Sequence, residues 1–357
     1  MNADFWKSKR VLVTGHTGFK GSWLCLWLSR LGADVTGFAL EAPTSPSLFH
    51  LAHAEDAVRS LHGDVRDGEA FLRAVREARP EIIIHMAAQT VVRTGYDAPF
   101  ETYETNVMGT VNLFEAVRRT DSVRAVVNVT TDKCYENREW EWAYRETDAL
   151  GGYDPYSNSK ACSELVTSAY RQSFFSTRAG GIGIATARAG NVLGGGDWTT
   201  HQLVPDIMRG FMERRAVVIR NPHAVRPWQF VLEPLRGYLT LAERLYHEPA
   251  RFSQAWNFGP ADDDARPVSW IADTLTRFWG DDASWRLEAA EAQRVHEAGM
   301  LRLDSSKART HLDWKPRMRL AQTLEFVVEW YKAYYHKHDV RDLTELHITR
   351  YELLEHP

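Results

Sequence analysis

Thr14-Gly15-His16-Thr17-Gly18-Phe19-Lys20-Gly21 sets three glycines at G-x-x-G-x-x-G spacing between two apolar stretches. The stretch before it, Arg10–Thr14, predicts a short buried strand, and residues 21–31 predict a strongly apolar helix. Glycines in such a turn permit a tight reversal and the close approach of a pyrophosphate, whose charge is stabilised by the N-terminus of the helix. The stretch therefore predicts the opening of a βαβ unit that carries a dinucleotide site.

Short apolar strands continue to alternate with helices beyond this turn. Strand-like stretches recur at 33–38, 82–85, 125–129 and 183–188. Helical stretches separate them, at 69–78, 106–119 and 156–174. This alternation predicts an α/β fold with a Rossmann-type, doubly wound parallel sheet.

The residue composition and the length of the predicted elements change after residue 190, where shorter elements rich in Arg, Trp and Pro begin. We predict that residues 1–190 form a dinucleotide-binding domain, to which residues 228–258 return. Residues 191–340 are predicted to form a smaller, partly interleaved α/β substrate domain that closes over the carboxyl edge of the sheet. A helical tail is predicted at 341–357.

Composition narrows the class of protein. The chain has 357 residues, 44% of them hydrophobic, and a net charge of −4, which gives no basic footprint for nucleic acid. It has neither a signal-peptide pattern nor an apolar run of ~18 residues, so we expect no membrane partner. Cys25, Cys134 and Cys162 lack metal-ligand spacing and suit a reducing compartment. We therefore expect a cytoplasmic protein without a metal site.

Tyr156 and Lys160 stand four residues apart in Asp154-Pro155-Tyr156-Ser157-Asn158-Ser159-Lys160, and no other tyrosine has a lysine at that distance. At this spacing the two side chains share one face of a helix. We expect the ammonium group to lower the pKa of the phenol, so that Tyr156 exchanges a proton with a substrate hydroxyl. The pair predicts redox chemistry on an alcohol; the alternative is a chance pairing.

Other candidate residues lie at the ends of predicted strands, where loops meet ligands in parallel sheets. Thr131-Asp132-Lys133 follows the strand at 125–129. In Gly63-Asp64-Val65, the aspartate suits an adenine amine, and the small residues of Ala87-Ala88-Gln89 leave room beside a cofactor. Each of the last two motifs is also compatible with an ordinary strand end.

These motifs resemble the extended short-chain dehydrogenase/reductase family of nucleotide-sugar enzymes over nearly the whole chain. Within that family, three stretches are similar to the branch of 4,6-dehydratases that act on CDP-glucose: Gly15 to Trp23, Thr131 to Asn137, and Gly151 to Lys160. The resemblance implies NAD as the cofactor and CDP-glucose as the small-molecule substrate. It also implies a homodimer formed through the helices at 106–119 and 156–174.

The resemblance implies a reaction in three steps, which are oxidation at sugar C4, elimination of water across C5 and C6, and return of the hydride to C6. Tyr156 would take the C4 hydroxyl proton, with Lys160 and Thr131 assisting. Asp132 would be the acid and Lys133 the base of the elimination. Related dehydratases carry Asp-Glu at these two positions, so the lysine departs from the wider pattern. The alternative is that Lys133 only pairs with Asp132 or a phosphate.

The resemblance also assigns the binding residues. The expected cofactor residues, besides Tyr156 and Lys160, are Gly15, Thr17, Gly18, Phe19, Lys20, Gly21, Asp64, Val65, Ala87, Ala88 and Gln89. The expected substrate residues are Asn191, Arg209, Arg220, Arg226, Trp228 and His296. Planar guanidinium groups suit a diphosphate, although a solvated surface charge is the commoner fate of an arginine.

One position departs from the family pattern. The family usually has an acidic residue at the end of the second strand for the adenosine ribose, and this chain has Ala39 there. No arginine replaces it, so NAD is preferred over NADP. Two other activities on this fold stay open, a nucleotide-sugar epimerase and a dehydratase for another nucleoside-diphosphate glucose. A more distant alternative is a non-catalytic dinucleotide-binding protein.

Overall fold

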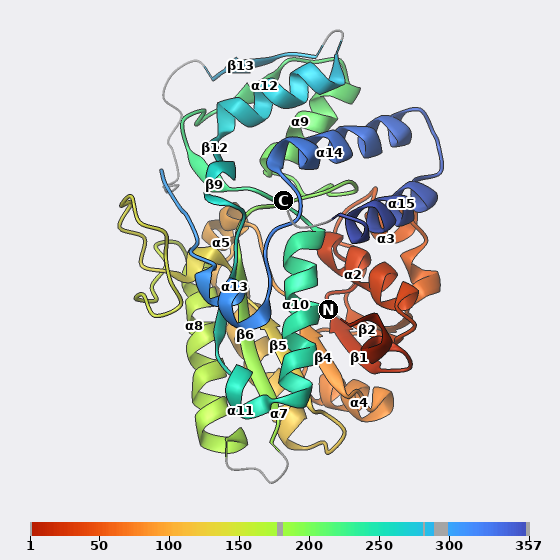
Figure 1. The fold of residues 1–357 in the computed structure, drawn as a ribbon, viewed down its shortest axis with the longest axis vertical. Coiled ribbons are helices and arrows are strands. Elements are labelled where there is room, and N and C mark those ends of the chain that lie inside the picture. The colour runs from red at the N-terminus through yellow and green to blue at the C-terminus, as the bar shows by residue number, and fades with distance from the viewer. Residues whose placement is uncertain (1, 177–180, 281–282, 289–298, 355–357) are drawn as a thin grey trace.

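Seven parallel strands form the central sheet, in the order β11-β6-β5-β4-β1-β2-β3 (Figure 1). The computed structural model describes residues 2–176, 181–280, 283–288 and 299–354. The strands are β1 (Arg10–Thr14), β2 (Asp34–Ala39), β3 (Arg59–His62), β4 (Ile82–His85), β5 (Ala125–Val129), β6 (Gly183–Ala189) and β11 (Ala255–Phe258). The predicted doubly wound α/β fold is confirmed.

Both faces of the sheet are buried because its strands are apolar at successive positions. Val11 and Val13 of β1 pack in one hydrophobic cluster, whereas Leu12 between them packs in a second cluster on the opposite face. In β4, Ile82 and Ile84 pack in the first cluster, and Ile83 between them packs in the second. Side chains of a strand point alternately to its two faces, so the sheet needs a helical layer on each side.

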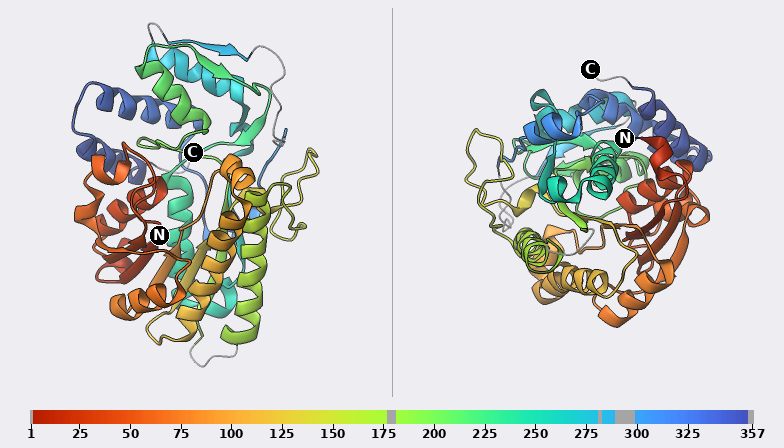
Figure 2. Two further views of the ribbon diagram at one scale, coloured as in Figure 1. Left: turned by 180° about the vertical axis from the view of Figure 1, so that it is seen from behind. Right: turned by 60° about the horizontal axis from the view of Figure 1, so that its bottom comes forward.

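Helices supply these two layers. Figure 1 shows α10 in front of the sheet, and the view from behind in Figure 2 shows the orange to yellow-green helices on the other side. The front helices are α2 (Phe19–Arg30) and α10 (Leu232–His247). The rear helices are α4 (Gly68–Ala78), α7 (Gly109–Arg118) and α8 (Pro155–Tyr170).

Two predicted helices are interrupted at one end by π-helical turns. The stretch predicted as one helix at 106–119 consists of a π turn, η2 (Glu104–Met108), followed by α7. The stretch predicted at 156–174 consists of α8 followed by a second π turn, η4 (Arg171–Phe175). A periodicity of apolar residues does not distinguish one turn of π-helix from α-helix, which explains the difference.

A smaller group of elements lies above the carboxyl edge of the sheet, at the top of Figure 1. It contains α9 (Leu203–Met212), α12 (Val268–Trp279), α14 (Leu320–Tyr335), and the paired strands β8 (Val217–Ile219) and β13 (Trp285–Leu287). The chain returns to the main sheet between them, through α10 and β11. We propose that these elements are the smaller, interleaved domain predicted from the sequence.

The remaining elements are short or terminal. The helix α15 (Val340–Glu352) closes the described chain and packs on α2, where Glu352 accepts a hydrogen bond from Trp27 Nε1 at 2.8 Å. The short helices are α1 (Ala3–Trp6), α3 (Leu48–Leu51), η1 (Ala54–Ala57), α5 (Val92–Asp97), α6 (Pro99–Tyr103), η3 (Asp132–Cys134), α11 (Pro249–Phe252), η5 (Asp262–Asp264) and α13 (Ser306–Leu312). The short strands are β7 (Val192–Leu193), β9 (Val225–Pro227), β10 (Gln229–Phe230) and β12 (Ala265–Pro267).

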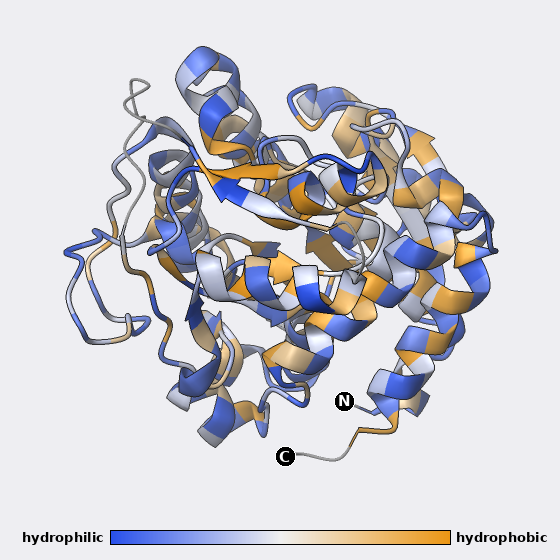
Figure 3. Cartoon of the chain, turned by 90° about the horizontal axis from the view of Figure 1, so that it is seen from above, coloured by the Kyte–Doolittle hydropathy of each residue, from blue (hydrophilic) through white to orange (hydrophobic). Residues whose placement is uncertain are grey.

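Figure 3 shows that apolar and polar residues are interleaved along the outer helices. Among the residues that the structure describes, no helix is long and apolar enough to span a bilayer. The same residues contain no group of three or more His, Cys, Asp or Glu side chains placed to hold a metal ion.

The strand order reverses between β1 and β4, and the glycine-rich turn lies at this point. Gly15 has a φ of +72° and packs so closely on the end of β4 that a Cβ there would lie 2.9 Å from the Ala87 nitrogen. Gly21 lies in the first turn of α2, where a Cβ would meet the Gly15 carbonyl oxygen at 2.2 Å. The turn is therefore closed by backbone contacts that only glycine permits.

We expect Gly21→Ala to lower the free energy of unfolding by ~1–3 kcal/mol, because a backbone oxygen cannot move aside for the new methyl group. Urea denaturation checks this value. Gly18→Ala is the matched control, since a Cβ there would meet only the Gly15 oxygen, at 3.4 Å. Equal stabilities of the two variants would contradict the close packing at Gly21.

Candidate active site

The helix α8 begins directly before Tyr156 because Asp154 and Pro155 start it. Asp154 is the N-cap residue, whose carboxylate accepts hydrogen bonds from the Ser157 backbone nitrogen at 2.9 Å and the Ser157 hydroxyl at 2.5 Å. Pro155 occupies the first helical position, where its missing N–H costs nothing. Tyr156 is thereby fixed in the first turn and Lys160 in the second.

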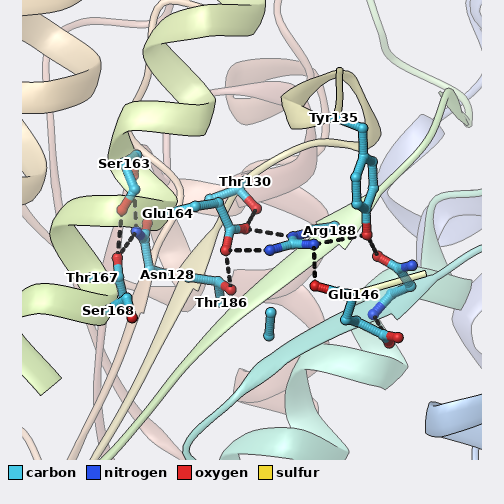
Figure 4. A network of polar contacts seen from close by, with 12 residues as sticks. Asn128, Thr130, Tyr135, Glu146, Ser163, Glu164, Thr167, Ser168, Thr186 and Arg188 are labelled. Carbon is cyan, nitrogen blue, oxygen red and sulfur yellow. Dashed lines mark hydrogen bonds and ion pairs between the residues drawn. The ribbon is translucent and has the colours of Figure 1, made fainter. Parts of the chain in front are cut away.

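Side chains of α8 and the end of β5 are joined at three consecutive residues. The Asn128 amide donates to Ser163 at 3.0 Å and to Thr167 at 2.8 Å. Lys160 Nζ donates to the Val129 carbonyl at 3.0 Å. The Thr130 hydroxyl donates to Glu164 at 2.5 Å. Figure 4 shows the Asn128 and Thr130 contacts.

The next residues, Thr131 to Cys134, leave the sheet in a tight turn that we call the catalytic turn. Thr131 caps the short helix η3, and its hydroxyl accepts a hydrogen bond from the Lys133 nitrogen at 3.3 Å. The same hydroxyl donates to Asp132 Oδ1 at 3.1 Å. Asp132 is 2% exposed, and its Oδ2 has no partner among the described residues.

Burial raises the pKa of Asp132, while Lys133, Thr131 and Arg226 act in the opposite direction. A raised pKa favours the protonated carboxyl group, which is the form that an acid catalyst needs. Gly190, directly after β6, packs against Pro227 and against the Oδ2 atom of Asp132. A Cβ at Gly190 would lie 3.1 Å from that atom.

Burial also raises the pKa of Tyr156, with the Thr131 hydroxyl acting the other way. The expected lowering by Lys160 is therefore wrong for these side chains alone. Lys160 directs its ammonium group to the Val129 carbonyl, and burial lowers its own pKa to about 8. Lys133 approaches from the catalytic turn, with Nζ 6.0 Å from the centroid of the Tyr156 ring.

Lys20 connects the glycine-rich turn to this cluster. Its Nζ donates to the Tyr238 hydroxyl at 3.0 Å, from α2 across to α10. Burial, followed by the nearby charge of Lys160, lowers the pKa of Lys20 to about 7, while Asp132 opposes the shift. Tyr238 was missed by sequence reasoning because it lies within a helix whose neighbouring residues are uniformly buried.

The glycine-rich turn offers a cradle at the N-terminus of α2. Gly18 is the N-cap residue of this helix and is nearly open in front, with only the Gly15 oxygen within 4 Å of a would-be Cβ. Thr17 is tied to the loop after β2, since its hydroxyl donates to the Leu40 carbonyl at 3.0 Å. Phe19 packs against Gly194. An open helix N-terminus with close backbone on both sides suits a pyrophosphate.

The residues predicted at the ends of β3 and β4 lie beside this cradle. Asp64 is held by Arg66 through contacts of 2.8 and 2.6 Å, and Val65 packs against Gly109. The Ala87 nitrogen donates to Thr14, and the Gln89 nitrogen donates to Asn106 at 2.9 Å. Ala88 lies between them.

Asn106 was missed by sequence reasoning, although it joins the β4 loop to α8. Its side-chain amide donates to the Gln89 carbonyl and to the Ser159 hydroxyl, both at 2.9 Å. The available signal was an asparagine within an otherwise helical stretch, since asparagine is unfavourable there unless its amide has partners.

The sequence predicts weak contacts to the adenosine ribose at the end of β2, and the structure shows the surroundings of this position. Ala39 ends β2 beside His62, its register partner in β3. Glu41, the nearest acid along the chain, is exposed and has its carboxylate 3.2 Å from His62 Nδ1.

Two of the predicted substrate residues lie near Asp132. Asn191 follows Gly190, and its carbonyl accepts from the Gln229 nitrogen at 3.0 Å. Arg226 is 9% exposed, donates to the carbonyls of Val225 and Gly299, and its charge acts on Asp132. Arg226 is therefore the predicted arginine best placed for a phosphate near the catalytic turn.

The other predicted substrate residues have different surroundings. Trp228 is 4% exposed and donates its indole N–H to the Arg266 carbonyl, so it packs beneath the site. Arg209 contacts Asp206 and the Trp198 carbonyl, and lines a cleft of about 1120 Å³ that shares no lining residue with the catalytic turn. Arg220 is exposed after β8. His296 lies outside the described residues.

The chain is similar in sequence to known proteins. The sequence model of the family described as GDP-mannose 4,6 dehydratase matches residues 12–253. The chain is 53% identical over 354 residues to the CDP-glucose 4,6-dehydratase of Salmonella typhimurium, with 98% of each chain covered. It is 24% identical over 346 residues to a dTDP-glucose 4,6-dehydratase of Escherichia coli, covering 90% and 92%.

Solved structures with similar folds are related more distantly in sequence. The dTDP-glucose 4,6-dehydratase of Bacillus anthracis, in complex with NAD, superposes with a TM-score of 0.73 at 22% identity, covering 90% of this chain and 96% of that one. An epimerase of Methanothermobacter thermautotrophicus gives a TM-score of 0.80 at 21% identity, with 95% and 96% covered. These similarities establish the shared fold.

Proposed function

Because the chain belongs to the GDP-mannose 4,6 dehydratase family, we propose that it is a lyase, a CDP-glucose 4,6-dehydratase that uses NAD. It converts CDP-D-glucose to CDP-4-keto-6-deoxy-D-glucose and water. The observation that carries this function is the catalytic turn, which sets a buried acid, Asp132, and an amine, Lys133, beside Tyr156. Redox chemistry alone needs only the tyrosine and Lys160; elimination of water needs the other pair as well.

The residues of the glycine-rich turn fit NAD. Its pyrophosphate would lie at the open N-terminus of α2, at Gly18, and the small residues Ala87 and Ala88 would face the dinucleotide. When bound, NAD⁺ would accept a hydride from sugar C4 and return it to C6, and its positive charge would favour the phenolate of Tyr156.

The side chains of the site carry the proton transfers. Tyr156 takes the proton of the C4 hydroxyl, and Thr131 hydrogen-bonds the same oxygen. The 4-keto group acidifies the C5 hydrogen, which Lys133 removes as a proton and gives back to C5 when the hydride returns to C6. Asp132, whose pKa is raised by burial, gives a proton to the departing C6 hydroxyl. Arg226 binds the diphosphate, which holds the sugar against this turn.

The reaction is tested by incubating the purified protein with NAD⁺ and one of CDP-, dTDP-, UDP- or GDP-glucose, and following the 4-keto product. We expect product from CDP-glucose and little from the others. A 4-epimer as the main product would show an epimerase instead, and product from a different nucleotide would reassign the base specificity. Binding of NAD without any turnover would indicate a non-catalytic protein.

We propose further that the chain forms a homodimer through α7 and α8. Four apolar side chains on α8 and on the neighbouring α6, η2 and η4 are exposed by 44% to 80%: Phe100, Met108, Leu165 and Phe174. Exposed apolar side chains gathered on neighbouring helices suit a second copy of the chain. The free cysteines Cys25, Cys134 and Cys162 support the further proposal of a cytoplasmic location.

We expect Tyr156→Phe to lower kcat by at least ~10²-fold, because the phenylalanine cannot take the C4 hydroxyl proton. Binding of CDP-glucose in a titration calorimeter and the melting temperature should stay close to wild type, since the change removes one oxygen. Near-normal turnover would contradict the assignment of Tyr156.

Lys133→Met should separate oxidation from elimination, because only the second step needs a base at C5. Reduced cofactor should then accumulate in a single turnover, measured by its near-ultraviolet absorbance. Asp132→Asn provides the companion variant, since it also blocks elimination while leaving the amine in place. Normal exchange of C5 deuterium with water in Lys133→Met would show that another group is the base.

We expect the protein to hold NAD loosely, because Ala39 offers no acceptor to the adenosine ribose and Glu41 faces His62. Losing charge-assisted hydrogen bonds of ~1.5–3 kcal/mol weakens binding by roughly 10- to 150-fold. Dinucleotide released on denaturing fresh protein should be well below one per chain, and Ala39→Asp should raise it. One retained NAD per chain in the wild type would refute the argument.

A further inference from the structure

Glu164 is a buried carboxylate that the proposed mechanism does not use. It lies one turn beyond Lys160 and two turns beyond Tyr156 on α8, and its side chain is 4% exposed. Its Oε1 accepts from Thr130 at 2.5 Å and Arg188 Nε at 2.9 Å. Its Oε2 accepts from Thr186 at 2.6 Å and Arg188 Nη2 at 2.9 Å. The carboxylate is therefore saturated by four donors.

The pair of Glu164 and Arg188 is isolated from solvent on both sides, since Arg188 is 3% exposed. A buried ion pair carries a large desolvation cost and often stabilises a protein no better than well-packed apolar side chains. Its presence at this depth therefore points to a role beyond stability.

The hydrogen bonds of this pair reach both ends of the catalytic turn. Thr130, bound by Glu164, directly precedes Thr131. Tyr135, which directly follows Cys134, accepts a hydrogen bond from Arg188 Nη1 at 2.8 Å and lies under its guanidinium group. Figure 4 shows Arg188 between Glu164 and Tyr135, with Thr130 above the carboxylate. The turn is thus fixed between two anchors that share one ion pair.

The same carboxylate also acts on Lys160 through space. Burial lowers the pKa of Lys160 to about 8, and the charge of Glu164 is the largest influence in the opposite direction. Other titratable groups are coupled to Lys160 or Glu164: Cys134 of the catalytic turn, Lys20 of α2, His85 of β4, Arg171 of η4 and Arg188 of β6. Of these groups, Glu164 is the anion that lies on the same helix as Lys160.

We propose that Glu164 is a positioning residue of the reaction, which holds the catalytic turn through Thr130 and supplies the counter-charge for the Lys160 ammonium group. The proposal rests on the proposed function, because it assigns Glu164 a task in that reaction. Its contacts with Thr130, Thr186 and Arg188 do not depend on any ligand.

The counter-charge is tested by NMR of protein labelled at lysine Cε, without substrate or cofactor. The chain has nine lysines, so the Lys160 signal is assigned by its loss in Lys160→Met. We expect the titration midpoint of Lys160 to fall by at least ~1 pH unit in Glu164→Gln, because the ammonium group loses the anion one helical turn away on α8.

Glu233→Gln is the matched control for this measurement. Glu233 is also fully buried and accepts hydrogen bonds from the Arg317 and Met318 nitrogens and from Tyr351, all at 2.7 Å. Its loss should lower the melting temperature and leave the Lys160 midpoint unchanged. An unchanged midpoint in Glu164→Gln as well would overturn the counter-charge.

The positioning role is tested by two isosteric variants that each remove one hydrogen bond to Glu164. Thr130→Val removes the bond next to the catalytic turn, and Thr186→Val removes the equivalent bond on β6. We expect Thr130→Val to slow single-turnover oxidation of CDP-glucose by ~10-fold or more with KM nearly unchanged, and Thr186→Val to slow it by at most ~2-fold.

The two variants remain informative if Glu164→Gln does not fold. Equal rates in Thr130→Val and Thr186→Val, at equal melting temperatures, would overturn the positioning role. A wild-type protein that does not convert CDP-glucose would refute the proposed function instead, and the NMR titration would still decide whether Glu164 keeps Lys160 charged.

Discussion

The alignment of α8 with the end of β5 is the constraint on which the chemistry of this protein depends. Three consecutive residues, 128 to 130, are bonded to the helix, so neither element can slide by one residue without breaking all three contacts. The helix brings Tyr156 and Lys160, and the strand delivers the catalytic turn. A reaction that needs four groups within reach of one sugar ring requires such a fixed junction, because small displacements of reacting groups slow catalysis strongly.

Exclusion of water is the second condition of the site. Asp132, Tyr156 and Lys160 are buried and Lys20 is half-buried, so their charges depend strongly on one another. The same burial that raises the pKa of Asp132 works against ionising Tyr156. The acid and the proton acceptor of the proposed reaction therefore share one buried environment, and both lie next to Thr131.

The sequence predicted the parts of the structure that have a local cause. The strands at 10–14, 82–85 and 125–129 were predicted with their observed bounds, because each is a short, largely apolar run. The strand β3 was not predicted, since three of its four residues are exposed and carry no apolar signal. Asn106, Glu164 and Tyr238 were missed for another reason. Their partners lie 17 to 218 residues away, and no spacing in the chain indicates such contacts.

The return of the chain through α10 and β11 has a consequence for how the protein is made. A nascent chain that ends near residue 190 already contains six strands of the sheet, but α10, which covers β4, β5 and β6, has not yet been synthesised. The front face of the sheet, with Ile84, Val127 and Ala185, is then open to water and to other chains. Lys20 also lacks its partner until residue 238 emerges. The chain must therefore extend to the end of α10 at residue 247 before this front face is covered. Until then, the front face is the part of the sheet that chaperones would protect.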